Sequence, residues 1–98
     1  MNRSDLIRQL AQRCSQLPPE VVEQTVHALL ECLTESLEQG ERIEIRGFGS
    51  WNLKSRPART ARNPKTGESV SIEPTIRIHF KPGLEFRERV NAGAERED

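Results

Sequence analysis

The stretch that decides the fold of this chain is Lys54-Ser55-Arg56-Pro57-Ala58-Arg59-Thr60-Ala61-Arg62-Asn63-Pro64-Lys65. Five of its twelve residues are basic and none is acidic, so it favours contact with an anion. It runs on into Thr66-Gly67, and an Asn-Pro step followed by Gly is typical of a turn, because Pro fixes φ and Gly accepts a positive φ. We therefore predict a β-hairpin with a proline at its tip and two arms that cover about residues 55–74.

The predicted hairpin has too few apolar side chains to form a core of its own. Between residues 55 and 74 only Val70 and Ile72 are large and apolar, which does not bury both faces of a two-stranded ribbon. Arms of about nine residues, at roughly 3.3 Å per residue, span on the order of 30 Å. We expect the hairpin to project and to follow a groove of a nucleic-acid duplex. The alternative interpretation is a solvated linker.

The distribution of charge supports a nucleic-acid partner, although the formal net charge of the 98 residues is zero. Residues 1–40 carry three basic and six acidic side chains, residues 41–92 carry eleven and six, and residues 93–98 carry one and three. Positive charge is therefore concentrated in the middle of the chain. A single domain of this length buries only about 60–65% of its unfolded surface, and a projecting hairpin lowers that fraction. A second chain would cover the remaining apolar surface, so we predict an obligate dimer.

Two amphipathic helices are predicted ahead of the basic stretch. Apolar side chains recur at helical spacing over residues 3–14, with Asn2 as the cap and Asp5 in the first turn, where the helix dipole favours an acidic group. A second helix is predicted from Pro19 to Gly40. Its apolar stripe consists of Val22, Val26, Leu29, Leu30, Leu33 and Leu37. This stripe is longer than the first helix can cover, so part of it must meet a sheet or a second subunit.

After Gly40 the apolar residues alternate with polar or basic ones, which predicts strands. The predicted strands cover residues 42–46, a run through Trp51 and Leu53 that leads into the hairpin, and a run from Ile76 to Lys81. The alternation places basic side chains on one face, so the sheet and the hairpin should share one charged surface. A short helix is predicted after Pro82-Gly83, and residues 93–98 are predicted to form a disordered acidic tail.

Together these patterns predict an α+β fold in one domain, residues 1–92: a helical hairpin, a three-stranded antiparallel sheet extended into a β-ribbon arm, and a short C-terminal helix. His27 and His79 have no Cys or carboxylate at metal-ligand spacing, and no Gly-rich phosphate loop precedes a helix. We therefore predict no enzyme activity, no cofactor, no metal and no small-molecule substrate. Neither a membrane span nor a signal peptide is recognisable, which predicts a cytoplasmic protein without a membrane partner.

The chemistry of the basic surface favours double-stranded DNA. Arg and Lys side chains neutralise phosphates and release counterions, which gives affinity without sequence readout. Pro64 adds a second mechanism, because a rigid side chain without a donor can wedge between base pairs from the minor groove. The alternative for Pro64 is a plain turn former. An RNA partner is a further alternative, but the wide, shallow minor groove of A-form RNA gives such a wedge little grip.

Three motifs of the chain are specific: Arg62-Asn63-Pro64-Lys65-Thr66-Gly67, Gly47-Phe48-Gly49-Ser50 and Phe80-Lys81-Pro82-Gly83. With these motifs the chain resembles, over residues 1 to about 91, the bacterial histone-like DNA-binding family of HU and integration host factor. The stretch Gly40-Glu41-Arg42-Ile43-Glu44-Ile45-Arg46 resembles the integration-host-factor branch rather than HU. The resemblance implies an intertwined dimer whose arms wrap DNA in the nucleoid. It implies a heterodimer with a homologous alpha chain, or alternatively an HU-like homodimer with little sequence preference.

The resemblance also assigns roles to single residues. Pro64 matches the intercalating proline, and Arg46, with Glu44 beside it, matches a pair that reaches the minor groove. We expect Glu44 to orient the Arg46 guanidinium by a charge-assisted hydrogen bond, with a plain cross-strand ion pair as the alternative. The expected DNA-binding residues are Arg3, Ser4, Arg42, Glu44, Arg46, Lys54, Arg56, Arg59, Arg62, Asn63, Lys65, Arg77 and Lys81. The chain departs from the family pattern at Ala61, at Arg77-Ile78 and at Leu84.

Overall fold

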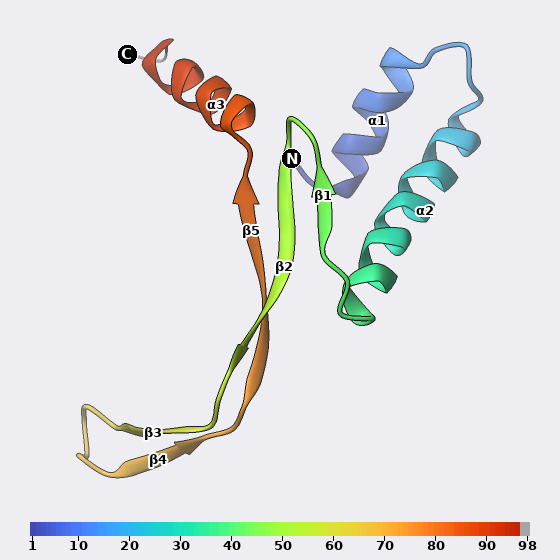
Figure 1. Ribbon diagram of the computed structural model, residues 1–98. Helices are drawn as coiled ribbons and strands as arrows, with labels where there is room; N and C mark the ends of the chain where they lie inside the picture. The colour runs from blue at the N-terminus through green and yellow to red at the C-terminus, as the bar shows by residue number, and fades with distance from the viewer. Residues whose placement is uncertain (97–98) are drawn as a thin grey trace. The chain divides into compact units, whose positions relative to one another are not determined.

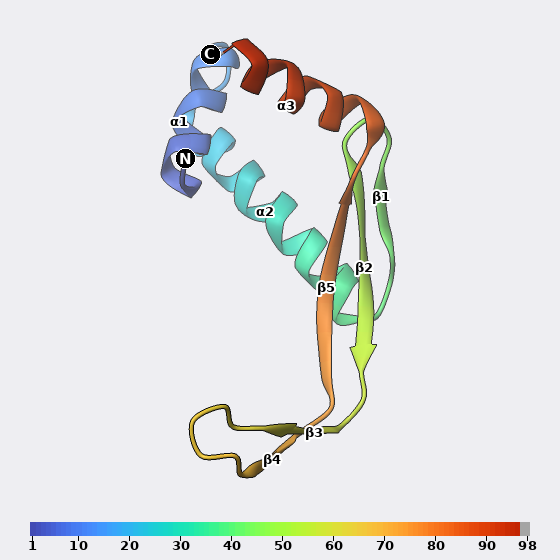
Figure 2. The same cartoon turned by 90° about the vertical axis from the view of Figure 1, so that its left-hand side faces the viewer.

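The computed structural model describes residues 1–96. The chain forms two compact units, one from Met1 to Glu38 and one that begins at Gln39. Figures 1 and 2 show the helices and strands of both units. That residues 1–92 act as a single domain stays a prediction.

The first unit is a helical hairpin of α1, Arg3–Arg13, and α2, Pro19–Glu38. A reciprocal cap fixes the start of α1: the Asp5 amide donates to Asn2 Oδ1 at 2.9 Å, and the Asn2 amide donates to Asp5 Oδ2 at 3.1 Å. Such a box satisfies two of the amides that a helix leaves unpaired at its start. Both helices are confirmed, and so is the Asn2 cap.

Part of the α2 stripe is buried and part is not. Val22 and Val26 are only 2% and 3% exposed, whereas Leu29, one turn further on, is 58% exposed. An apolar side chain at that position gains free energy when a partner removes it from water. The sequence predicts that part of the α2 stripe meets a sheet or a second subunit, and the exposure of Leu29 agrees with this prediction.

The second unit contains a three-stranded antiparallel sheet in the order β1-β2-β5. Its strands are β1, Ile43–Ile45; β2, Gly49–Arg56; and β5, Thr75–Pro82. Ile43 lies opposite Trp51, which lies opposite Phe80, so the apolar residues of all three strands share one face. The predicted strand positions and the predicted alternation are both confirmed.

An aromatic cluster joins this sheet to α3, which spans Leu84–Arg96. The rings of Phe48 and Phe86 stack with centroids 4.7 Å apart, and those of Trp51 and Phe80 lie 4.8 Å apart. The Gly83 amide donates to the Phe48 carbonyl at 2.8 Å, which ties the start of α3 to the β1–β2 turn. Aromatic pairs at these separations add to the stabilisation from area burial alone.

Gly49 begins β2 where a larger residue does not fit. A Cβ at Gly49 would lie 2.6 Å from the Lys81 carbonyl oxygen and 2.7 Å from the Phe80 ring. A Cβ at Gly93, within α3, would meet nothing within 4 Å. The first glycine is required by the close approach of β2 and β5, and the second is not required by packing.

Gly49→Ala should therefore lower the free energy of unfolding by about 1–3 kcal/mol, because the added methyl forces β5 to shift. Gly93→Ala is the matched control and should raise it by up to about 1 kcal/mol, because alanine favours a helix interior over glycine. Urea titrations followed by circular dichroism measure both changes. A Gly49→Ala variant as stable as the parent would contradict the described packing of β2 against β5.

The predicted hairpin is present as a two-stranded ribbon of β3, Arg59–Arg62, and β4, Ser69–Ile72. It continues from the ends of β2 and β5 (Figure 2). The ladder is interrupted at its root, since β2 and β5 pair as far as Arg56 opposite Thr75 and pairing resumes at Arg59 opposite Ile72. The register of the two strands is the same on both sides of the gap, so Pro57 and Pro74 lie opposite each other and there is no bulge.

The sequence predicted one continuous ribbon, and the two facing prolines explain the difference. Proline has no backbone N–H, so neither residue can donate to the ladder between the two strands. The ribbon and the three-stranded sheet are therefore separate hydrogen-bonded sheets.

The C-terminal helix is longer than predicted, because α3 continues to Arg96. The prediction of disorder was wrong for residues 93–96, and residues 97–98 lie outside the described part of the chain. Ala92 and Ala94 flank Gly93, and alanine is the strongest helix former, so one glycine does not end the helix. None of the helices within residues 1–96 is long and apolar enough to cross a membrane.

Candidate nucleic-acid interface

The second face of the β1-β2-β5 sheet is polar and basic. Glu44 lies opposite Ser50, which lies opposite Lys81, and the same face carries Asn52 opposite His79 and Lys54 opposite Arg77. Arg56, the last residue of β2, belongs to this face as well. The register thus brings together the predicted residues Glu44, Lys54, Arg56, Arg77 and Lys81, while Arg42 and Arg46 lie just before and just after β1.

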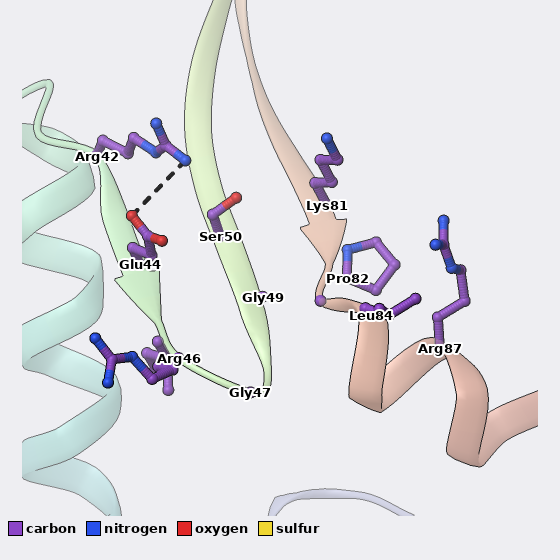
Figure 3. Close-up of a pocket in the computed structure, with 12 residues that line it drawn as sticks. Arg42, Glu44, Arg46, Gly47, Gly49, Ser50, Lys81, Pro82, Leu84 and Arg87 are labelled. Atoms are coloured by element: carbon purple, nitrogen blue, oxygen red, sulfur yellow. Dashed lines mark ion pairs between the residues drawn. The ribbon is translucent and has the colours of Figure 1, made fainter.

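Around Glu44, the structure differs from the predicted pairing. Glu44 Oε2 lies 3.9 Å from a guanidinium nitrogen of Arg42, and the Arg46 guanidinium points away from Glu44 (Figure 3). Arg42 and Arg46 are both two residues from Glu44, so spacing alone does not choose between them. Arg46 follows the end of β1 and lies in the turn that leads to Gly49, where its side chain leaves the strand direction.

An open cavity of about 410 Å³ lies beside this pair, between the β1–β2 turn and the start of α3 (Figure 3). Its lining includes the cationic side chains of Arg42, Arg46, Lys81 and Arg87, and one acid, Glu44. Four cations against one anion make this cavity suited to a polyanion. It lies at the edge of the basic sheet face.

Arg87 was not among the predicted binding residues. It lies one helical turn after Leu84, and both side chains border the same cavity. The signal that could have found Arg87 is its spacing of three residues from Leu84, which places both side chains on the same side of α3.

Three of the hydrogen bonds that hold the ribbon tip involve Asn63. Its Oδ1 accepts from the Lys65 amide at 2.9 Å and its carbonyl accepts from the Gly67 amide at 2.8 Å, while its own amide donates to the Glu68 carbonyl at 2.8 Å. Gly67 has the predicted positive φ, 73°. Pro64 is exposed on this turn, and the predicted turn with a positive φ at Gly67 is confirmed.

Charge on the ribbon is spread over both of its faces. Arg59 lies opposite Ile72 and Arg62 lies opposite Ser69. Since the two arginines are three residues apart on one strand, they point to opposite faces. The prediction of a single charged surface therefore holds for the sheet but not for the whole ribbon. Lys65 extends the charge to the tip.

The remaining predicted residues, Arg3 and Ser4, belong to the first turn of α1 in the helical unit. A guanidinium nitrogen of Arg3 lies 3.4 Å from His27 Nδ1, and His27 Nε2 lies 3.8 Å from a carboxylate oxygen of Glu23. Among the described side chains, those of residues 1–94, no group of three or more His, Cys, Asp or Glu is placed to hold a metal ion.

The chain is a small α+β protein with a basic sheet face and a basic ribbon that has a proline at its tip. These are the features of nucleic-acid-binding proteins that use a β-ribbon. The chain belongs to the bacterial DNA-binding protein family, whose family model matches residues 1–91. The family is defined by DNA binding and is not an enzyme family. Both the family and the α+β fold inferred from the sequence are confirmed.

The chain is similar to integration host factor subunit beta of several bacteria. It is 56% identical over 92 residues to that of Shewanella amazonensis, covering 94% of this chain and 97% of the relative. It is 53% identical over 91 residues to that of Escherichia fergusonii, covering 93% and 97%.

Two solved structures show the same fold. A cocrystal structure of Anabaena HU with DNA matches with a TM-score of 0.80 and 34% identity, covering 92% of this chain and 97% of that one. A mutant HU from Thermotoga maritima matches with a TM-score of 0.66 and 28% identity, covering 92% and 99%.

Proposed function

We propose that this chain is the beta-type subunit of an integration-host-factor-like heterodimer that binds double-stranded DNA and bends it. Pro64 would enter the minor groove and unstack a base step, and the homologous alpha chain would supply a second arm. The resulting architectural activity would serve recombination, replication and the control of transcription and translation. The protein would act in the cytoplasm, on the nucleoid.

The observation that carries this proposal is the exposed, hydrogen-bonded tip around Pro64. A wedge must keep its shape while it separates stacked bases, and the three hydrogen bonds of Asn63 hold the turn without help from Pro64. Wedging apolar side chains into the minor groove is an established mechanism of minor-groove architectural proteins, for which integration host factor and HU are themselves standard examples. Arg59, Arg62 and Lys65 would hold the flanking phosphates and groove walls.

Integration-host-factor-like and HU-like functions differ in partner choice and sequence preference. The similarity to HU structures supports a homodimer as the second candidate, while the higher identity to beta subunits favours the heterodimer. Analytical ultracentrifugation and gel-phasing assays of the chain alone and mixed with a homologous alpha chain separate the two. Strong bending of a defined site only by the mixture supports the heterodimer, and equal bending of unrelated duplexes by the chain alone supports the homodimer.

Sequence preference should depend on Arg46 and Glu44. In the minor groove an arginine senses groove width and the absence of the guanine amino group. Arg46→Ala should therefore lose both affinity and preference, with discrimination between preferred and random DNA reduced by roughly 1–3 kcal/mol.

Glu44→Ala should relax preference while leaving non-specific binding equal or stronger. Removing the carboxylate deletes a repulsion with phosphates and releases Arg42 from its 3.9 Å ion pair, so that Arg42 can contact phosphates of any sequence. Competition titrations with preferred and random duplexes measure both effects. Parallel losses on both duplexes for both variants would make these residues phosphate contacts only and would favour the HU-like function.

A further inference from the structure

Lys54 and Arg77 face each other directly across the β2–β5 ladder. Both side chains are exposed on the basic face of the sheet. Residues in such positions have Cβ atoms about 4.5–5.5 Å apart, and like charges directly opposite destabilise a sheet. The pairing of two cations at this point is therefore unfavourable in the protein alone.

The neighbouring side chains do not offset this repulsion. On the same face the adjoining pairs are Ser50 with Lys81, Asn52 with His79, and Arg56 with Thr75, none of which includes an acid. Among residues 1–94, whose side chains the structure describes, no ion pair includes Lys54 or Arg77. The nearest acid along the face, Glu44, lies beyond Ser50 and is paired with Arg42.

We propose that Lys54 and Arg77 hold one phosphate of the DNA backbone between them, an assignment that rests on the proposed function. An anion bound to both cations removes their repulsion and adds two charge-assisted hydrogen-bonding partners. The planar guanidinium can present two parallel donors to phosphate oxygens, while the lysine ammonium acts as a compact charge beside them.

The position of Lys54 and Arg77 in the sheet suggests what a phosphate bound between them would do. Lys54 and Arg77 lie one same-face pair before Arg56 and Thr75, where the ladder between β2 and β5 ends and the chain passes to the ribbon (Figure 1). A phosphate held there would fix the duplex at the root of the ribbon. The ribbon would then close along the groove from a defined starting point.

The test compares Lys54→Gln, Arg77→Gln and the double variant with the parent, in the assembly that binds duplex DNA. Each neutralised phosphate contributes a slope of about −0.9 to the dependence of log K on log salt concentration. If the two side chains share one phosphate, the slope for the double variant should be shallower than that for the parent by about 0.9 in total. It should bind about fivefold to tenfold more weakly near 0.1 M salt, on preferred and random duplexes alike.

Thermal stability provides an independent test, because the same substitutions that weaken DNA binding should stabilise the protein without DNA. Each single variant should melt about 2–4 °C higher than the parent at low salt without DNA, and the gain should disappear at high salt, because it reflects relief of repulsion. Arg13→Gln, in the last turn of α1, is the matched control, since it removes the same charge from outside the sheet. It should show neither the loss of slope nor the gain in melting temperature.

If the slope of log K against log salt concentration became shallower by about 1.8 in the double variant, the two side chains would contact two separate phosphates. An unchanged slope would mean that neither contacts a phosphate. Either result overturns the proposal that they share one phosphate. Unchanged melting temperatures at low salt would also overturn it, because the repulsion that motivates it would be absent. Failure of the parent assembly to bind and bend duplex DNA would instead reject the proposed function itself.

Discussion

Pro64→Ala is expected to leave the fold and most of the phosphate attraction intact while strongly reducing the DNA bend. Alanine is too small and too flexible to hold a base step open, whereas the cations of the ribbon are unchanged. Unstacking a step costs a few kcal/mol, and without the wedge the duplex has no reason to adopt that state. Gel-phasing assays measure the bend, and circular dichroism checks the fold.

The same variant should discriminate between intact and weakened DNA. Its loss of affinity should be smaller on a duplex nicked or made flexible at the wedge site, because the cost of unstacking is already relieved there. Thr66→Ala is a suitable control: it removes the 3.3 Å contact of the Glu68 amide with Thr66 Oγ1 but keeps the proline. Equal bending by Pro64→Ala and the parent would reject intercalation.

Leu29→Asp is expected to abolish dimer formation. Leu29 is largely exposed in the single chain, so the substitution should leave the contact between α1 and α2 intact. In a dimer that covers the α2 stripe, the new carboxylate would be buried without a partner, at a penalty of about 3–5 kcal/mol. Sedimentation velocity over a range of concentrations would then show monomers.

Gln24→Asp provides the matched control on the same helix, since Gln24 is exposed and polar and lies outside the apolar stripe. It adds the same charge and should keep the parent's sedimentation behaviour. A parent that sediments as a monomer would contradict the dimer itself. A Leu29→Asp dimer as stable as the parent would place the interface elsewhere.

Much of this fold was predictable because its signals are local. Asn2 and Asp5 are three residues apart and form the capping box by themselves. Alternating side chains fix which face of the sheet is basic, and the residues from Asn63 to Gly67 contain everything that their turn requires. In each case the physical cause lies within a few residues of its effect.

The features that could not be predicted from the sequence depend on which residues meet in the folded chain, and residue spacing does not decide that. Glu44 has an arginine two residues away on each side, and an exposed ion pair is worth only about 0–1 kcal/mol, so the preference for Arg42 is not encoded in the pattern. Arg87 borders the cavity of the candidate interface because α3 begins beside the β1–β2 turn. The gap in the ladder arises only when Pro57 meets Pro74, and that meeting depends on the register of two strands far apart in sequence.

The facing prolines also bear on how force passes through the protein. A bent duplex is elastic and pushes back on whatever holds it, with a stored energy of a few kcal/mol. Across Pro57 and Pro74 no backbone hydrogen bond couples the strands, so recoil can tilt the ribbon through rotations of a few backbone bonds. The hydrogen bonds between β2 and β5 would then stay intact, and the aromatic cluster that anchors α3 would bear little of the force. We therefore expect the joint at Pro57 and Pro74 to bend reversibly before the three-stranded sheet is disturbed.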